Sequence, residues 1–282
     1  AGIHHAWILH RLEEVKDSVD AAVAGYNFND GAQALYRFIW NEFCDWYLEM
    51  IKDELNREDP EERKVAEACL HTVLREILIL LHPFTPFVTQ EIWSHLPGIA
   101  QENLAKEPFP EARAYCRNPE VVEAMQLLQE TIVAVRTIRA ELNIAPSLHL
   151  DVLVKTRDSK AKEILDTYVG MIQTLARVGQ VTTGPDVTGP KASASAVVQG
   201  NQCFVPLTGA VNFEDELARL DKELGKIDKD LGIVTKKLAN EGFVAKAPKE
   251  VVDKERAKAD ELADKRTKLE DLQQRLKDAM EA

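Results

Sequence analysis

The sequence predicts a mainly α protein made of three successive parts. Apolar residues recur at three- and four-residue steps through residues 1–115, the pattern of amphipathic helices in an antiparallel bundle. Helical stretches mix with short period-two runs over residues 116–210, which indicates a small α+β module. A heptad stripe opens the last part, residues 211–282, and predicts an antiparallel coiled-coil hairpin.

Three helices are expected in the bundle before its first proline-rich corner. The first, in "AWILHRLEEVKDSVDAAVAGY", has one apolar face, formed by Ile8, Leu12, Val15, Val19, Ala22 and Val23. A turn follows, where Asn29 or Asp30 suits the N-cap of the second helix. In that helix, "AQALYRFIWNEFCDWYLEMIKDEL", apolar side chains spread round the cylinder, which predicts neighbours on several sides. Pro60 is placed to occupy position N1 of the third helix.

The stretch "HPFTPFVTQEIW" predicts a corner between two helices. Pro83 should end the helix that runs through Leu81, because the residue before a proline avoids the α region. Thr85 is placed as N-cap and Pro86 as N1 of the next helix, where a missing N–H is harmless. We expect His82 to bond locally at this corner rather than to take part in a reaction.

The α+β module is predicted from a succession of helical and strand patterns. Residues 119–143 form a long helical stretch, and residues 148–155 alternate as a half-buried strand does. A second helix, in "KAKEILDTYVGMIQTLARVG", should end with Gly179 as its C-cap. "QVTT" and "ASAVVQGNQCFVPL" then favour strands of a small antiparallel sheet, with a hairpin turn at Gly200-Asn201.

The last part has unbroken coiled-coil spacing over its first helix. Apolar residues follow one another at alternating steps of four and three: Phe213, Leu217, Leu220, Leu224, Ile227, Leu231, Val234 and Leu238. Gly242 and Pro248 interrupt the pattern, and a second helix follows with its seam at Leu262, Leu269, Leu272 and Leu276. At about 1.5 Å per residue the first helix should reach roughly 39 Å. We therefore expect a thin arm.

Composition narrows the class of protein. The chain has 282 residues, of which 45% are apolar, and no run of about 18 apolar residues that would span a membrane. Its start lacks the features of a signal peptide and looks like a cut made inside a longer chain. The cysteines at positions 44, 69, 116 and 203 match neither a metal knuckle nor a compact disulfide framework. We expect reduced thiols and a cytoplasmic protein.

No catalytic, metal or cofactor site is predicted in this chain. The strings GxxxxGK[ST], GxGxxG and GxSxG do not occur. The histidines show no spacing typical of metal ligands, whether near the start (His4, His5, His10) or later (His71, His82, His95). Paired carboxylates stand in charged loops or at helix ends, as solvated residues do.

The net charge of −12 disfavours a nucleic-acid partner until its distribution is considered. Residues 212–282 carry 16 bases against 18 acids, whereas the first 211 residues carry 19 against 29. Within the arm, residues 236–258 hold seven bases against four acids. Cations near an aromatic ring suit phosphate contact with base stacking. The arm tip is therefore the main candidate binding site, formed by Lys236, Lys237, Phe243, Lys246, Lys249, Arg256 and Lys258.

A structural interpretation of the tip stays open beside this one. Phe243 and Val244 can equally pack as a staple of the hairpin turn, which would leave the lysines as ordinary surface. A second and weaker basic patch is predicted in the α+β module: Arg136, Arg139, Lys155 and Arg157, together with Lys160 and Lys162.

Two regions of the chain carry a family resemblance. "LLHPFTPFVTQEIW", with the upstream "LYRFIWNEFCDWYLEMIK", resembles the helical anticodon-binding domain of class I aminoacyl-tRNA synthetases, in the form shared by the valine, isoleucine and leucine enzymes. The run from Trp40 to Tyr47 resembles the valine enzymes in particular. So does the ending, "FVPLTGAVNFEDELARLDKEL" and "NEGFVAKAPKEVVDKERAK", which is similar to the C-terminal coiled-coil arm of the bacterial valyl-tRNA synthetases.

The resemblance implies that the chain holds tRNA(Val), the bundle near the anticodon and the arm against the elbow where the D and T loops meet. The HIGH and KMSKS motifs of the family's catalytic domain do not occur here. This part alone is therefore expected to be inactive, although a full-length enzyme would join valine to tRNA(Val) with ATP and Mg. A monomer without a membrane partner is implied as well.

Two alternatives remain at this stage. An isoleucine or leucine enzyme would share the bundle, but the isoleucine enzymes typically end in a cysteine-ligated zinc module that these cysteines cannot form. A coiled-coil module that binds another protein would have an apolar arm tip. It would also give no reason for the strings at Trp40–Tyr47 and His82–Trp93.

Overall fold

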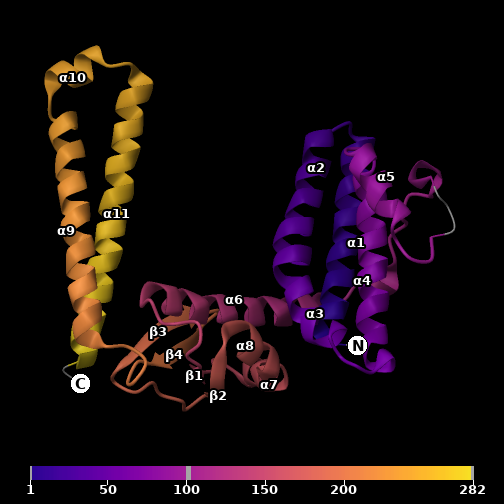
Figure 1. Cartoon of the computed structure of the whole chain (residues 1–282), viewed down its shortest axis with the longest axis horizontal. Helices are drawn as coiled ribbons and strands as arrows, with labels where there is room; N and C mark the ends of the chain where they lie inside the picture. The colour runs from indigo at the N-terminus through magenta and orange to yellow at the C-terminus, as the bar shows by residue number, and fades with distance from the viewer. Residues whose placement is uncertain (1, 100–102, 281–282) are drawn as a thin grey trace. The chain divides into compact units, whose positions relative to one another are not determined.

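The computed structural model describes residues 2–99 and 103–280, without the side chains of Glu241, Lys246, Arg275 and Ala279. It divides the chain into two compact units, residues 1–130 and 131–282. The predicted fold class is confirmed, because helices dominate and the described residues add one small sheet (Figure 1). No helix of the described residues has the length and apolar character that a membrane span needs.

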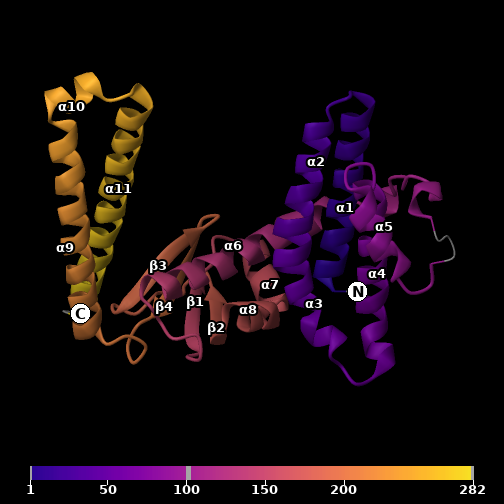
Figure 2. The same ribbon diagram turned by 45° about the horizontal axis from the view of Figure 1, so that its top comes forward.

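The first unit is a helical bundle. In both views α1 lies between α2 and α4 (Figures 1 and 2). Its helices are α1 (Ile3–Ala24), α2 (Phe28–Arg37), the π-helix η1 (Phe38–Tyr47), α3 (Leu48–Leu55), α4 (Pro60–Leu81) and α5 (Pro86–Ser94), followed by the 3₁₀ turns η2 (Leu104–Lys106) and η3 (Ala114–Cys116). On α1, the predicted apolar face is buried except for Val23, which is 37% exposed.

The second predicted helix is continuous but not uniform. A π-helical segment, η1, separates α2 from α3, and the N–H of Leu48 reaches back to the carbonyl of Phe43. The N-cap residue of α2 is Asn27, two or three residues before the predicted Asn29 or Asp30, and its side chain makes no capping bond. The π segment also coincides with the Trp40–Tyr47 string, and such segments are frequent at functional sites.

The corner at His82 is confirmed in most respects. α4 ends at Leu81 with His82 as C-cap, and α5 begins with Pro86 at N1. Pro83 is exposed and lies between the two helices, as predicted. Nδ1 of His82 lies 2.8 Å from Oγ1 of Thr89, which is a local bond as expected. Thr85 occupies the N-cap position of α5 as predicted, but its hydroxyl makes no capping bond and donates to the carbonyl of Leu81.

The structure predicts that His82→Gln lowers stability and leaves any RNA binding unchanged. Thr89 is fully buried and its hydroxyl also donates to the carbonyl of Thr85, so the His82–Thr89 bond closes a local network. Losing one such bond costs about 1 kcal/mol. Urea unfolding followed by tryptophan fluorescence measures this. An unchanged unfolding midpoint would contradict the architectural role of His82.

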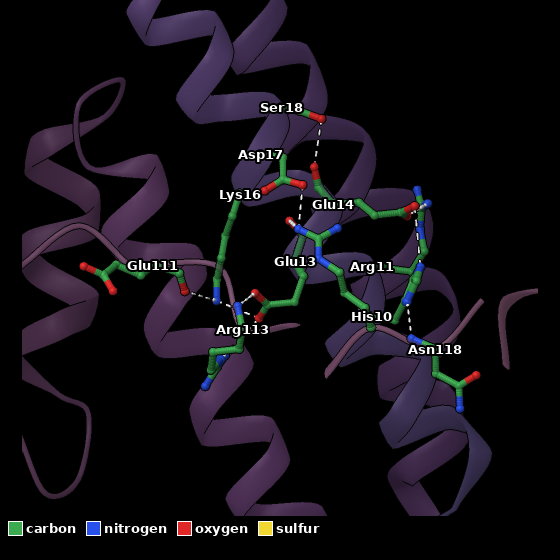
Figure 3. Close-up of polar contacts among 11 residues, drawn as sticks. His10, Arg11, Glu13, Glu14, Lys16, Asp17, Ser18, Glu111, Arg113 and Asn118 are labelled. Carbon is green, nitrogen blue, oxygen red and sulfur yellow. Dashed lines mark hydrogen bonds and ion pairs between the residues drawn. The ribbon is translucent and has the colours of Figure 1, made fainter. Parts of the chain in front are cut away.

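A buried charge cluster fixes the segment after α5 onto α1 and α4. Figure 3 shows the contacts between this segment and α1. Glu13 is fully buried, and Lys16 is 2% exposed with its Nζ 2.8 Å from Glu13 and 2.6 Å from Glu76. Arg113, just before η3, completes the cluster: its Nη2 lies 2.7 Å from Glu76, and both its main-chain N–H and its Nε donate to Glu13. The sequence pattern did not predict this cluster, because charged side chains are rarely buried.

The sheet of the second unit is mixed rather than antiparallel. Its strands are β1 (Leu150–Lys155), β2 (Val178–Gly184), β3 (Ser193–Val198) and β4 (Asn201–Pro206), in the order β2-β1-β4-β3. β1 and β2 pair in parallel, because helices α7 (Ser159–Thr167) and α8 (Val169–Ala176) connect them as a crossover. The other pairs are antiparallel, and α6 (Pro119–Glu141) precedes the sheet.

Two turn predictions in this unit are wrong by one or two residues. α8 ends at Ala176 with Arg177 in the left-handed conformation at φ 54°, so Gly179 is not a C-cap and lies within β2. The β3–β4 hairpin turns at Gln199 and Gly200, both with positive φ, so Asn201 begins β4. Asn201 is buried instead, and its Oδ1 accepts from the N–H of Arg157.

The arm of the second unit is the predicted hairpin. α9 (Phe213–Leu238) and α11 (Lys249–Met280) run antiparallel, and the short helix α10 (Glu241–Lys246) joins them where a loop was expected (Figure 1). Each of the eight predicted seam residues of α9 is buried or half-buried, as are the four on α11. Ion pairs such as Arg266–Asp228, at 2.7 Å, reinforce the register across the arm.

Candidate nucleic-acid interface

The arm tip is built on a capped turn. Oδ1 of Asn240 accepts from the N–H of Phe243 at 3.2 Å and caps α10. Nζ of Lys237 lies 5.6 Å from the centre of the Phe243 ring and 2.6 Å from Oε1 of Glu255 on α11. The hydrogen bond from Lys237 lowers the pKa of Glu255. Lys237 and half-buried Phe243 therefore brace the tip. The structural interpretation assigned a packing role to Phe243 but left Lys237 as ordinary surface.

The remaining predicted bases of the tip are exposed on both helices of the arm. Lys236 on α9 and Lys249 and Lys258 on α11 face solvent. Arg256 is exposed too and lies 3.6 Å from Asp253. The side chain of Lys246 lies outside the described residues. The tip therefore presents exposed cations on both helices of the arm, which is the chemistry that a phosphate backbone needs.

The second predicted patch includes one arginine with a structural role. Arg139 is 7% exposed, and its guanidinium donates to the carbonyls of Ala145, Ala176 and Arg177. Burial and neighbouring Arg177 lower the pKa of Arg139. Arg136 is exposed and donates to the carbonyl of Leu175. Together these arginines hold the ends of α6 and α8.

A cleft of about 460 Å³ opens beside them. Its lining combines cationic and apolar residues: Arg136, Arg139, Ala140, Asn143, Ile144, Pro146, Leu175, Ala176 and Arg177. The described lining contains no acidic residue, which suits an anion.

The other members of the patch lie apart from this cleft's lining. Lys155 is exposed at the end of β1. Arg157 donates to Asp158 at 2.8 Å and to the carbonyl of Gln199 at 2.9 Å. Asp158 caps α7, and the N–H of Ala161 is the main cause that lowers the pKa of Asp158. Arg157 thus supports the loop between β3 and β4.

Exposed aromatic side chains on the first unit were not predicted as a site. Tyr26 and Phe28 are 82% and 53% exposed, with ring centres 6.4 Å apart. Tyr36 and Trp40 are 62% and 53% exposed, with ring centres 6.3 Å apart. The helical period could have predicted this pair, because Tyr36 and Trp40 are four residues apart and so lie on one face of the helix. Leu35 lies on the buried face. Such rings are the surfaces on which unpaired RNA bases stack.

Comparison with known proteins matches both ends of the chain. The sequence profile of the anticodon-binding domain of tRNA ligases matches residues 5–154. The profile of the valyl tRNA synthetase tRNA binding arm matches residues 212–277. These matches agree with the two regions that carried the resemblance.

Curated relatives align along nearly the whole chain. A valine–tRNA ligase of Nitratidesulfovibrio vulgaris is 58% identical over 99% of this chain and 31% of its own length. Those of Desulfotalea psychrophila and Geobacillus stearothermophilus are 39% and 38% identical over 97% and 92% of this chain. The chain spans about a third of the length of these relatives. Because the anticodon-binding profile covers more than half of the residues, this chain belongs to the family of anticodon-binding domains of tRNA ligases.

Proposed function

We propose that this chain is the tRNA-holding C-terminal part of a valine–tRNA ligase, the ATP-dependent enzyme that joins valine to tRNA(Val). The observation that supports this most strongly is the 58% identity to one such enzyme, which runs through both the bundle and the arm. The chemical step would belong to the rest of the enzyme. The chain would act in the cytoplasm, as a monomer, and would have no activity alone.

Each of the three predicted parts has a role in this proposal. The bundle, residues 1–115, holds the anticodon stem and loop, and its exposed rings at Tyr36 and Trp40 offer stacking surfaces to unpaired bases. The module, residues 116–210, connects the two binding parts. The arm, residues 211–282, contacts the tRNA elbow through the exposed lysines of its tip.

The net charge of −12 does not oppose this function. RNA helices are bound largely through shape and phosphate contacts, which need cations only along the surface that meets the backbone. Lys236, Lys249 and Lys258 supply such cations on an arm that is close to neutral as a whole.

Binding of labelled tRNA(Val) and of a non-cognate tRNA, each across a salt series, tests the proposal. We expect binding that is stronger for tRNA(Val) and that weakens as salt rises, because phosphate contacts release counterions. The slope of log affinity against log salt gives the number of phosphates that the protein neutralises, at about 0.9 per phosphate for a duplex. Binding that is absent at low salt, or equal for the two tRNAs, would contradict it.

A further inference from the structure

Two helices of the first unit bring three metal-ligating side chains together. His4 and His5 lie in the first turn of α1, and Glu54 lies near the end of α3. Nε2 of His4 is 2.9 Å from Oε1 of Glu54, and Nε2 of His5 is 2.9 Å from Oε2. One ligand atom from each residue lies within 4.8 Å of the other two. Sequence reasoning missed this group because Glu54 stands 49 positions from His5.

His4 is buried without the hydrogen bonds that a buried imidazole needs. It is 7% exposed, and neither ring nitrogen has a hydrogen-bond partner among the described residues. The contact with Glu54 is close but is not aligned for such a bond. A buried polar group left in this way is costly, unless it binds something else.

Surrounding residues hold the two rings in place. Nδ1 of His5 lies 3.0 Å from the hydroxyl of Tyr47, which is fully buried. Metal-binding histidines usually have a partner on their second nitrogen, and that bond fixes the ring. Gly2 lies against His4 so closely that a Cβ at position 2 would be 2.4 Å from Cε1. Glu54 is 23% exposed, which gives an ion a path from solvent.

We propose that His4, His5 and Glu54 form a binding site for a divalent first-row metal ion of the Zn²⁺ type. Two imidazoles and one carboxylate are a Zn²⁺ ligand set with a fourth position open to solvent, whereas Mg²⁺ prefers oxygen ligands alone. Tetrahedral ligands about 2.0–2.1 Å from zinc lie about 3.4 Å from one another. The nitrogen–oxygen contacts of 2.9 Å and the limit of 4.8 Å within which all three ligand atoms lie bracket this separation. The ion ties the start of α1 to the end of α3.

Titration with zinc chloride against a colorimetric zinc indicator tests this site on the whole chain. The wild type is compared with His4→Gln, Glu54→Gln and Tyr47→Phe. A matched control is His95→Gln, because His95 also faces a glutamate, Glu91 at 3.2 Å, but on the exposed surface. We expect one tight equivalent of zinc in the wild type and in the control. Either ligand variant should lose this equivalent, and Tyr47→Phe should bind about 10–100-fold more weakly.

Two further measurements keep the test independent of folding defects. Zinc, but not magnesium, should raise the melting temperature of the wild type and the His95→Gln control, because an ion bound only to the folded state stabilises it. X-ray absorption of the zinc-loaded wild type should show two imidazole ligands. Zinc affinity equal in the wild type and His4→Gln would overturn the proposal, as would an absorption spectrum without imidazole. Neither readout involves tRNA, so failure here leaves the proposed function untouched.

Discussion

Glu13→Gln is expected to destabilise the first unit by about 3–5 kcal/mol, the usual effect of removing one partner from a buried ion pair. Glu13 is fully buried and receives Lys16 and both the main chain and side chain of Arg113. Glutamine keeps the shape but removes the charge. Of the described residues, Glu76 would then be the one carboxylate left to balance the charges of both Lys16, which is 2% exposed, and Arg113.

The measurement is urea unfolding followed by tryptophan fluorescence. All four tryptophans of the chain lie within residues 1–130, so the signal reports on this unit alone. The matched control is Glu49→Gln, which breaks a pair with Lys52 at the same i,i+3 spacing but with side chains 45% and 58% exposed. The control should change stability by about 0–1 kcal/mol. Equal losses of stability in the two variants would show that the buried Glu13 pair contributes no more to stability than an exposed pair.

Reversing the charge of Lys236, Lys249 and Lys258 together should weaken binding of tRNA(Val) at least about tenfold at low salt. These lysines are exposed members of the tip. In the proposed complex they are the cations that meet phosphates, and no interior bond among the described residues depends on them. The slope of log affinity against log salt should fall by about 0.9 for each phosphate that the variant no longer neutralises. Lys237 is left in place, because it pairs with Glu255 and its replacement would disturb the tip itself.

A control with the same net charge separates position from total charge. Lys222, Lys226 and Lys229 lie on α9, farther along the helix from the tip, and reversing them changes the charge equally. We expect a smaller loss of affinity and little change in slope. Melting temperatures of both variants should stay near that of the wild type. If the two variants lose affinity equally, the tip has no special role in binding.

Local patterns were sufficient for several elements of the fold. The heptad spacing of α9 predicted its seam, because residues at a and d positions face one side of a helix whatever partner covers them. Pro60 and Pro86 predicted the starts of α4 and α5, because a proline is compatible with only a few helix positions. Sequence alone also carried the family resemblance, because the relevant strings are continuous.

Patterns were insufficient in three places. The π segment, η1, is invisible to a period of 3.6. Thr85 stands at the N-cap of α5, but its hydroxyl makes no capping bond, which the sequence pattern does not reveal. Arg139 was interpreted as a surface cation, because it is an arginine three residues after Arg136 on a predicted helix. Only packing placed it against the carbonyls at the end of α8.

The sequence by itself therefore determined the succession of helices, the coiled-coil arm, the corner at His82 and the membership of a tRNA-ligase family. Each depends on residues within a few positions of one another. The tertiary structure decided the parallel pairing of β1 with β2, the burial of Glu13 with Lys16, and the meeting of His4 and His5 with Glu54. These features depend on contacts between residues that are far apart in the sequence and meet only in the folded chain. The free energies of such contacts cannot be read from the spacing of residues along one segment.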